Sequence, residues 1–314
     1  MSNRQVLITG ASGFVGSRLV SYLSSNTDLN VIEVVRSKGG SQDNNRVIVC
    51  EDLCSGFDWP CYDIDTVIHL AGKAHAMNEQ SSFDLDVFRA INTDATLMLA
   101  KQAAAAGVRR FIFLSSIGVY GTSSGQPISS LTDPHPVEPY AISKFEAELL
   151  LRDLSISTGM EVVVIRPPLV YGPNAPGNFS RLKKLCCMGF PLPFGRVSNR
   201  RTFIGIDNLC SLIEVCITHQ NATLAPILPG DVEVVSTVDF MRHIAKAANV
   251  NLKLAPFPIC LLKLLFLFAG KRNMYGKIFD DLEINTQETY DLLNWVPPKS
   301  LEVGVYDAVV SSES

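Results

Sequence analysis

The sequence lacks the positive charge that binding to nucleic acid would require. Only 18% of its 314 residues are charged, and 27 basic residues against 31 acidic ones give a formal net charge of −4. No field is therefore available to attract a polyanion, so we expect no nucleic-acid partner. Any small anionic ligand must instead be held by individual arginine or lysine side chains.

Metal and disulfide patterns are also missing. The eight cysteines are scattered, with no CxxC pair and no histidine at ligand spacing, so we predict no metal site. Free thiols of this kind suit a reducing compartment, and we expect a cytoplasmic protein. The first residues lead directly into a predicted strand, so we expect no signal peptide.

Hydrophobic runs long enough to cross a bilayer are absent too, and we expect no transmembrane span. The very apolar stretch 259–269 is short and contains Lys263. It predicts a helix of the globular fold, with contact to a membrane surface or a membrane enzyme as the alternative.

Strands and helices alternate over the first part of the chain, in a composition that is 47% hydrophobic. The predicted strands are 5–9, 31–35, 46–50, 64–70, 109–114 and 161–165, and the predicted helices between them include 14–24, 85–106 and 138–154. This order predicts an α/β fold with a doubly wound parallel sheet. From about residue 174 the chain is loop-rich, and then helices are predicted at 207–219, 236–248, 259–269 and 286–293. This part predicts a smaller C-terminal lobe.

A glycine pattern stands between the first strand and the first helix. Gly10 allows a tight turn, Gly13 lets the backbone approach a pyrophosphate, and Gly16 lets helix and strand pack closely. The free N–H groups of the helix N-terminus face the phosphates. The pattern therefore predicts a dinucleotide site that includes the intervening Ser12, Phe14 and Val15.

The end of the second strand carries no acid where NAD-binding folds place a carboxylate against the ribose hydroxyls. Arg36 stands there instead, which suits a 2′-phosphate and favours NADP(H), with NAD(H) as the alternative. Glu33 is another candidate carboxylate, although strand alternation does not fix its direction. If Arg36 is merely solvated, the preference for NADP(H) disappears.

Other candidate cofactor contacts follow the next strands. Asp52 and Leu53 are expected to meet the adenine. Asn92 lies in the helix 85–106, where a polar side chain facing the sheet often bridges to backbone. His69 is expected to be a core histidine. Small residues after the fourth strand would let a cofactor lie across the sheet edge, and the predicted contacts there are Leu70, Ala71, Gly72 and Lys73.

Tyr140 and Lys144 are four residues apart in a predicted helix and therefore share a face. A free tyrosine has a pKa of about 10, and a nearby ammonium favours the phenolate. Ser116, at the end of the fifth strand, can bind a carbonyl or alcohol oxygen. Serine, tyrosine and lysine together can move a proton while a nicotinamide cofactor moves a hydride.

With its motifs in this order along the chain, the sequence resembles the extended short-chain dehydrogenase/reductase family. Within that family it resembles the NAD(P)-dependent nucleotide-sugar epimerases and dehydratases. The resemblance covers nearly the whole chain. It implies a Rossmann domain over residues 1–173 that carries the Ser-Tyr-Lys triad. Residues 174–314 would then form mainly a nucleotide-sugar-binding lobe, with some segments returning to the core. Besides the residues above, the resemblance is carried by Val119-Tyr120-Gly121, Arg166-Pro167, Val170-Tyr171-Gly172-Pro173, Arg201, Ile206-Asp207-Asn208-Leu209 and Leu293-Asn294-Trp295-Val296-Pro297.

The resemblance also implies roles for individual residues. Tyr140 is the acid–base group, and Lys144 lowers its pKa and binds the nicotinamide ribose. Ser116 binds the reacting C4 oxygen with help from Ser115. The remaining implied contacts are Arg201 with the diphosphate, Asn178 with the diphosphate or sugar, Pro167 and Val170 with the cofactor, and Arg200 and Lys277 as weaker candidates. The family further implies a homodimer that pairs through 85–106 and 138–154.

Three functions stay open at this stage. The chain is similar to bacterial enzymes of surface-polysaccharide (O-antigen) synthesis that are often labelled UDP-glucose 4-epimerase, some of which resemble reductases of UDP-4-keto-6-deoxy-N-acetylglucosamine. An NADPH-dependent 4-keto reductase and a UDP-sugar 4-epimerase with tightly held NAD would use the same triad. No Asp-Glu pair follows Ser116, so dehydration is disfavoured. A non-catalytic dinucleotide sensor is the third reading.

Overall fold

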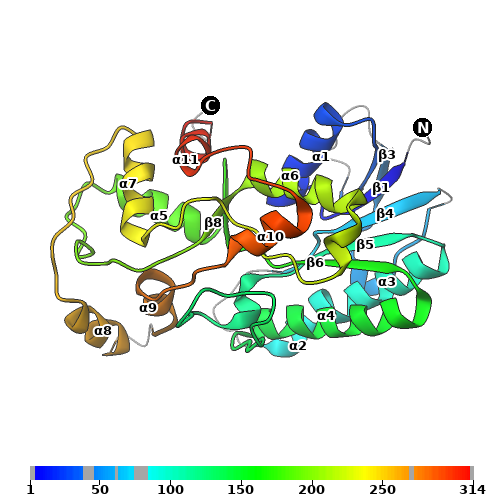
Figure 1. Ribbon diagram of the computed structural model, residues 1–314, viewed down its shortest axis with the longest axis horizontal. Coiled ribbons are helices and arrows are strands. Elements are labelled where there is room, and N and C mark those ends of the chain that lie inside the picture. The colour runs from blue at the N-terminus through cyan, green and yellow to red at the C-terminus, as the bar shows by residue number, and fades with distance from the viewer. Residues whose placement is uncertain (1–3, 38–45, 61–62, 74–83, 269–271, 312–314) are drawn as a thin grey trace. The chain divides into compact units, whose positions relative to one another are not determined.

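The computed structural model describes residues 4–37, 46–60, 63–73, 84–268 and 272–311. The chain forms two compact units, each assembled from separate segments. The first contains Met1–Val119, Pro134–Arg166 and Cys210–Ile227, and the second contains Tyr120–Asp133, Pro167–Leu209 and Leu228–Ser314. The colours of Figure 1 follow the chain through both units.

A parallel sheet forms the centre of the first unit (Figure 1). Within the described residues it has six strands in the order β3-β2-β1-β4-β5-β6. Their side chains are largely buried, as expected when helices cover both faces. The predicted doubly wound parallel sheet is confirmed. The strands are β1 (Gln5–Thr9), β2 (Asn30–Val35), β3 (Arg46–Val49), β4 (Ile64–His69), β5 (Arg110–Leu114) and β6 (Glu161–Ile165).

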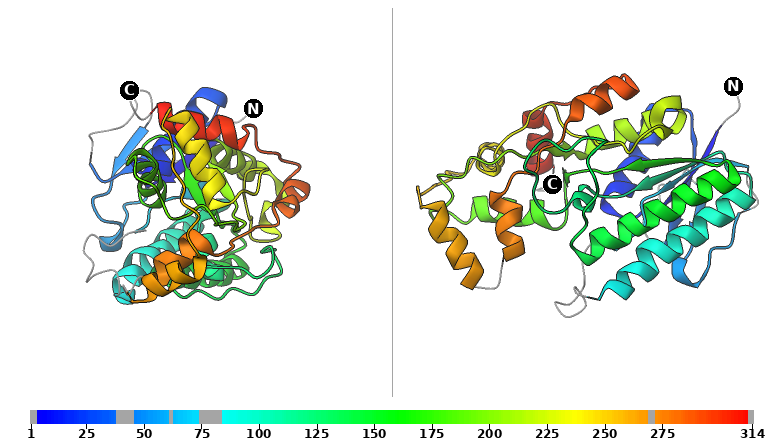
Figure 2. Two further views of the ribbon diagram at one scale, coloured as in Figure 1. Left: turned by 90° about the vertical axis from the view of Figure 1, so that its left-hand side faces the viewer. Right: turned by 60° about the horizontal axis from the view of Figure 1, so that its bottom comes forward.

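Helices lie on both faces of this sheet. On one face, Leu99 of α3 (Ala95–Ala105) and Leu151 of α4 (Pro139–Thr158) join Phe111 of the sheet in one apolar cluster. Figure 2 shows these two helices running side by side below the strands. The opposite face is covered by α1 (Phe14–Asn26), which buries its leucines there.

The helix predicted over 85–106 is interrupted. It consists of α2 (Leu85–Arg89), a π-helical turn (Ala90–Asp94) and α3. Such turns inside a helix occur frequently at functional sites. This one contains Asn92, which is completely buried.

The segment Cys210–Ile227 completes the first unit. The guanidinium of Arg110, which is 1% exposed, donates to the carbonyl oxygens of Cys216 at 2.5 Å and His219 at 3.0 Å. At the end of this segment, Ile227 accepts from the backbone N–H of Arg166 at 2.8 Å and donates to the carbonyl of Val164 at 2.8 Å. The buried guanidinium of Arg110 also donates from Nε to Glu161 at 2.7 Å, so its hydrogen-bonding capacity is satisfied by these two carbonyls and the carboxylate.

The second unit has its own core. The strands β7 (Leu169–Tyr171) and β8 (Phe203–Gly205) pair in parallel. Phe203 stacks on Phe240 of α7 with 4.0 Å between the ring centroids. The other helices are α5 (Asn178–Cys187), α6 (Ile206–Thr218, which continues into the first unit's segment), α7 (Thr237–Ala247), α8 (Ile259–Phe268), α9 (Arg272–Phe279), α10 (Thr286–Leu293) and α11 (Leu301–Val310).

The helices predicted at 207–219, 236–248, 259–269 and 286–293 are confirmed within one or two residues at each end. The expectation that the chain is loop-rich from 174 onward is wrong for 178–187, which form α5. Phe179, Leu182 and Cys186 bury one face of that helix, and this pattern at helical spacing is a signal that the sequence contains.

Membrane-spanning helices and metal-binding clusters are both absent from the described part of the chain. None of its helices combines the length and the hydrophobicity needed to cross a membrane. No group of three or more His, Cys, Asp or Glu side chains is arranged there to hold a metal ion.

Candidate active site

The glycine turn after β1 is so closely packed that a side chain at Gly10 or Gly16 would clash with backbone atoms. Gly10 has φ +70°, and a Cβ at this position would lie 2.7 Å from the backbone nitrogen of Ala71. A Cβ on Gly16 would lie 2.1 Å from the carbonyl oxygen of Gly10. Gly13 begins α1 without a side-chain cap, so the first N–H groups of that helix are left for a ligand. The turn therefore fits a dinucleotide pyrophosphate.

The other predicted residues of this turn lie at its rim. Ser12 is exposed, and Phe14 and Val15 are half-buried in the first turn of α1. Their backbone N–H groups belong to the uncapped end of the helix.

The end of β2 separates the two candidates for contacting the adenosine ribose. Arg36 follows the last strand residue and is exposed. Glu33 is only 2% exposed and lies within the sheet. Of the two candidates, Arg36 is therefore the one whose charged side chain is accessible at the end of β2.

Asp52 has local partners. Its carboxylate accepts from the backbone N–H of Cys54 at 2.9 Å and from the hydroxyl of Ser55 at 2.8 Å. These hydrogen bonds lower the pKa of the Asp52 carboxyl and cap the 3₁₀ turn Leu53–Ser55. Leu53 packs against the apolar cluster under the sheet. The carboxylate thus organises the turn, whereas the predicted contact of both residues with adenine stays a prediction.

Asn92 ties the loop after β4 to helix α4. Its Oδ1 accepts from the backbone N–H of Lys73 at 2.8 Å, and its Nδ2 donates to the carbonyl of Lys73 at 3.1 Å and to the hydroxyl of Ser143 at 3.0 Å. A Cβ on Gly72 would lie 3.0 Å from this Oδ1 and 3.1 Å from Nζ of Lys144. The loop Leu70–Lys73 therefore runs directly beside the ammonium group of Lys144.

The three predicted catalytic side chains lie together. Ser116, just beyond β5, hydrogen-bonds the phenol of Tyr140 on the first turn of α4. Lys144, one turn further along α4 and 4% exposed, donates from Nζ to the carbonyl of Leu114 at 3.0 Å. The ammonium also lies over the ring of Phe113, 4.5 Å from its centroid. Carbonyl and ring both favour the charged form of the lysine.

The pKa values of this group reflect its burial. Burial raises the pKa of Tyr140 to about 12, opposed by the hydrogen bond with Ser116. Burial likewise lowers the pKa of Lys144 to about 8, opposed by the negative charge of Glu148. The sequence led us to expect a lowered pKa for Tyr140. That expectation is wrong for this structure: burial raises the pKa, because the phenol is removed from water.

His69 is a core residue, as expected. Its Nδ1 lies 2.7 Å from the hydroxyl of Thr9 and its Nε2 lies 2.9 Å from the hydroxyl of Thr96. Burial, together with the charge of Lys144, lowers its pKa to about 3. The imidazole of His69 therefore stays neutral and adds no positive charge beside the ammonium of Lys144.

The sequence did not predict the pair formed by Glu148 and Arg166. Nε of Arg166 donates to the two carboxylate oxygens of Glu148 at 3.1 and 3.2 Å, and its Nη2 makes a closer contact. The hydroxyl of Ser115 donates to the same carboxylate. Ser115, predicted to assist substrate binding, is thus a buried partner of Glu148. The available signal was the spacing of four residues between Lys144 and Glu148 on one helix.

Two of the residues predicted to bind the substrate or its diphosphate, Arg201 and Arg200, already have hydrogen-bond or ion-pair partners within the second unit. Arg201 is 8% exposed and donates to the carbonyl of Asp280 at 2.9 Å, and burial lowers its pKa to about 10. Asn178 is half-buried and begins α5. Arg200 is exposed and pairs with Glu283 at 2.5 Å. Of the other predicted residues, Pro167 is buried, Val170 is half-buried in β7, and the side chain of Lys277 lies outside the described part.

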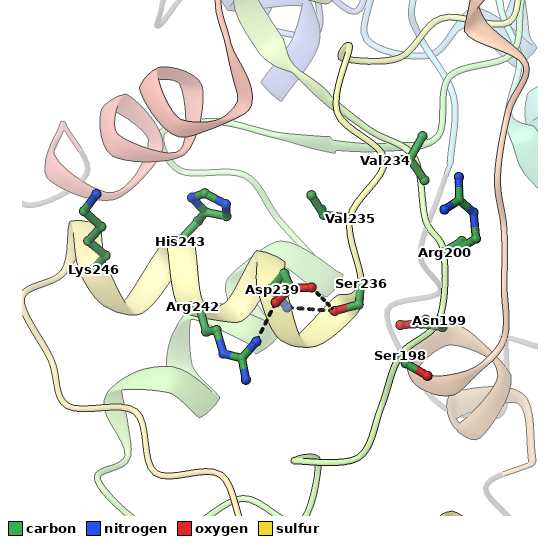
Figure 3. Close-up of a pocket in the computed structure, with 10 residues that line it drawn as sticks. All are labelled: Ser198, Asn199, Arg200, Val234, Val235, Ser236, Asp239, Arg242, His243 and Lys246. Carbon is green, nitrogen blue, oxygen red and sulfur yellow. Dashed lines mark hydrogen bonds and ion pairs between the residues drawn. The ribbon is translucent and has the colours of Figure 1, made fainter.

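A hollow of about 570 Å³ in the second unit is lined by α7 and the chain around Arg200 (Figure 3). It is rich in basic side chains, but each of three has an acidic partner. Arg242 pairs with Asp239 at 2.6 Å, Lys246 pairs with Glu302 at 2.6 Å, and Arg200 pairs with Glu283. Because these charges are compensated, we assign no anionic ligand to the hollow.

The parallel sheet, the uncapped glycine turn at its carboxyl edge and the Ser-Tyr-Lys cluster define an α/β dinucleotide-binding enzyme of the short-chain dehydrogenase/reductase class. Residues 6–227 match the NAD dependent epimerase/dehydratase family, and the chain belongs to that family.

Its relatives include epimerases and reductases of nucleotide sugars. The chain is 37% identical to UDP-glucose 4-epimerase of Vibrio cholerae over 305 residues, covering 96% of this chain and 93% of that protein. It is 28% identical to GDP-6-deoxy-D-mannose reductase of Pseudomonas aeruginosa over 268 residues, covering 81% and 84%. UDP-glucuronic acid 4-epimerase from Bacillus cereus, solved with NAD, shares the fold with a TM-score of 0.77 at 21% identity over 98% of both chains.

Proposed function

We propose that this enzyme uses NADPH to reduce the C4 ketone of a UDP-4-keto-6-deoxy-N-acetylhexosamine. The observation that carries the proposal is the end of β2. Arg36 is exposed there, while Glu33 is 2% exposed and lies within the sheet, two residues before the strand end. A guanidinium suits a 2′-phosphate because it can donate two hydrogen bonds to the phosphate oxygens. The sugar is proposed from the resemblance of the sequence to reductases of such ketones.

The chain's own residues supply the proton and the polar contacts. In the proposed reaction the hydroxyl of Ser116 donates a hydrogen bond to the C4 oxygen of the sugar and polarises the ketone. The phenol of Tyr140, protonated because burial raises its pKa to about 12, gives its proton to that oxygen. The ammonium of Lys144 then stabilises the phenolate that remains.

The cofactor would lie along the glycine turn and the loop Leu70–Lys73. A bound nicotinamide dinucleotide supplies the hydride that C4 receives. The N–H groups at the start of α1 would hold its pyrophosphate, and Lys144 would reach its nicotinamide ribose. Arg201 and Asn178 of the second unit are proposed to hold the diphosphate and sugar of the substrate.

A UDP-sugar 4-epimerase is the second candidate. The Vibrio cholerae relative carries that name, and a 4-epimerase would use the same Ser116, Tyr140 and Lys144. Tyr140 would then remove the proton from the C4 hydroxyl and later return it, with NAD held throughout. Arg36 would have no ligand in that enzyme.

Measuring NADPH absorbance separates the two candidates. Purified protein is mixed with NADPH and a UDP-4-keto-6-deoxy-N-acetylhexosamine, and in parallel with NAD and either UDP-glucose or UDP-N-acetylglucosamine. Stoichiometric loss of NADPH absorbance is expected. Conversion of a UDP-sugar to its C4 epimer, without consumption of NADPH, would establish the epimerase instead.

Arg36→Glu should reverse the cofactor preference. A charge-assisted hydrogen bond to phosphate contributes about 1.5 to 3 kcal/mol, so loss of the guanidinium should raise the KM for NADPH by roughly tenfold to hundredfold. The introduced carboxylate should at the same time improve the use of NADH. Initial rates with both cofactors test this, and Arg152→Glu, at an exposed arginine of α4, is the matched control. An unchanged ratio of the two KM values would remove Arg36 from the cofactor site.

The cellular setting is proposed on the same basis. We propose a cytoplasmic homodimer that pairs through the α2–α3 and α4 surfaces and serves the synthesis of O-antigen or related surface polysaccharides. Light scattering of the purified protein tests the dimer.

A further inference from the structure

We propose that Glu148 and Arg166 are a positioning pair for this reaction, in which the carboxylate of Glu148 keeps Lys144 charged and fixes the hydroxyl of Ser115 beneath the catalytic group. This inference deepens the proposed function and rests on it for its catalytic meaning. Neither residue needs to contact substrate or cofactor.

The geometry joins three elements at one carboxylate. Glu148 lies on α4, one turn beyond Lys144, and its side chain is 5% exposed. Arg166 follows β6, is 6% exposed, and donates from Nε and Nη2 to both carboxylate oxygens. Ser115 follows β5 and donates its hydroxyl to Oε1. The pair therefore fixes α4, which carries Tyr140 and Lys144, against the ends of β5 and β6.

Stability alone is a poor explanation for this arrangement. Taking a carboxylate and a guanidinium out of water costs free energy that their attraction only partly recovers, and apolar replacements of buried pairs are often as stable. A carboxylate placed one turn from Lys144 has an electrostatic effect that an apolar side chain could not supply.

The other groups around Lys144 do not substitute for that charge. Among the described neighbours, His69 is neutral because its pKa is lowered to about 3, and Tyr140 is neutral because its pKa is raised. Phe113 and the carbonyl of Leu114 contribute a ring face and a dipole. The negative charge that acts on Lys144 against burial is that of Glu148, moderated by Arg166.

The direction in which Glu148 shifts the pKa of Lys144 follows from this arrangement. Burial favours the neutral amine of Lys144, and Glu148 favours the ammonium. Removing the carboxylate charge should lower the pKa of Lys144 further below about 8. Lys144 would then lose its proton at a lower pH, and the alkaline limb of the activity profile should move to lower pH.

The decisive variant is Glu148→Gln, which removes the charge and retains an amide for Ser115. The pKa of Lys144 is measured in the ligand-free enzyme by NMR of ε-labelled lysine, with the signal assigned through Lys144→Met. A decrease of about one unit or more is expected, as for loss of an opposite charge at close range. Glu148→Asp should restore most of the shift. Glu146→Gln is the matched control, since Glu146 lies on α4 like Glu148 but pairs with Arg89 of α2 and does not act on Lys144.

The pH profile of kcat/KM then connects the pair to the reaction. In Glu148→Gln the alkaline limb should move with the pKa of Lys144. An unchanged pKa, or a loss of activity that is uniform over all pH values, would overturn the positioning role. A shifted pKa with no corresponding change in the profile would leave the electrostatic pair intact and contradict the proposed role of Lys144 in catalysis.

If Glu148→Gln fails to fold because Arg166 is left unpaired, the double variant Glu148→Gln/Arg166→Gln replaces it. Removal of both charges avoids an uncompensated guanidinium. The pKa of Lys144 should still fall, by less than in the single variant, because the closer charge is that of Glu148. A pKa at or above that of the parent enzyme would overturn the proposal.

Discussion

Replacing Tyr140 with phenylalanine should lower kcat by about a thousandfold, within the range that general acid–base catalysis contributes. The change removes one oxygen, whose partner is the hydroxyl of Ser116, and retains the ring that packs against Phe88 with 6.3 Å between centroids. The thermal denaturation midpoint should therefore change little. Steady-state rates measured with saturating NADPH and keto-sugar test the prediction.

Tyr290→Phe is the matched control for this experiment. Tyr290 is also largely buried, and its hydroxyl donates to the carbonyl of Gly230 at 3.0 Å. The same oxygen is lost there without a predicted role in proton transfer, so kcat should stay close to that of the parent. If Tyr140→Phe retains comparable activity, the assignment of Tyr140 as proton donor is wrong.

Gly16→Ala should both destabilise the first unit and abolish cofactor binding. The added Cβ would lie 2.1 Å from the carbonyl oxygen of Gly10 and 2.8 Å from its carbonyl carbon. Both are backbone atoms, so the turn after β1 must move to relieve the contact. Overpacking of this kind costs about 1 to 3 kcal/mol, and we expect the upper end of that range. Chemical denaturation measures the loss, and NADPH fluorescence measures binding.

Gly125→Ala provides the comparison for Gly16→Ala. No heavy atom lies within 4 Å of a Cβ at Gly125, so the free energy of unfolding should change by at most about 0.5 kcal/mol. Alanine is a better helix former than glycine by about 1 kcal/mol, which would favour Gly16→Ala if the contact were harmless. Normal NADPH binding by Gly16→Ala would show that the turn is looser than this geometry implies.

Local patterns explain why much of the fold was predictable. The spacing of apolar residues and the glycine turn lie within short stretches, so the strands of the sheet and helices such as α4 could be found from the chain alone. The segment 178–187 was misjudged as part of a loop-rich stretch because the alternation of strands and helices stops there, although its buried positions follow helical spacing.

The candidate site was predictable only where its residues share a local element. Tyr140 and Lys144 lie on one helix, so their proximity follows from helix geometry. Arg166 reaches Glu148 only because β6 ends beside α4, and this depends on how the helix is rotated against the sheet. The raised pKa of Tyr140 was likewise inaccessible, because burial is a property of the folded chain and not of a motif.

The segmented first unit also has a consequence for how the protein is made. Arg110 and Arg166 are synthesised well before Cys216, His219 and Ile227, whose backbone groups they require. A nascent chain that has emerged only through β6 already contains Glu161, which accepts from Nε of Arg110, but it lacks the two carbonyl acceptors of that guanidinium. The end of β6 likewise lacks its backbone partner Ile227. N-terminal domains commonly fold first during translation. Here the first unit cannot complete these hydrogen bonds until Ile227 has been made, which is after residues 167–209 of the second unit.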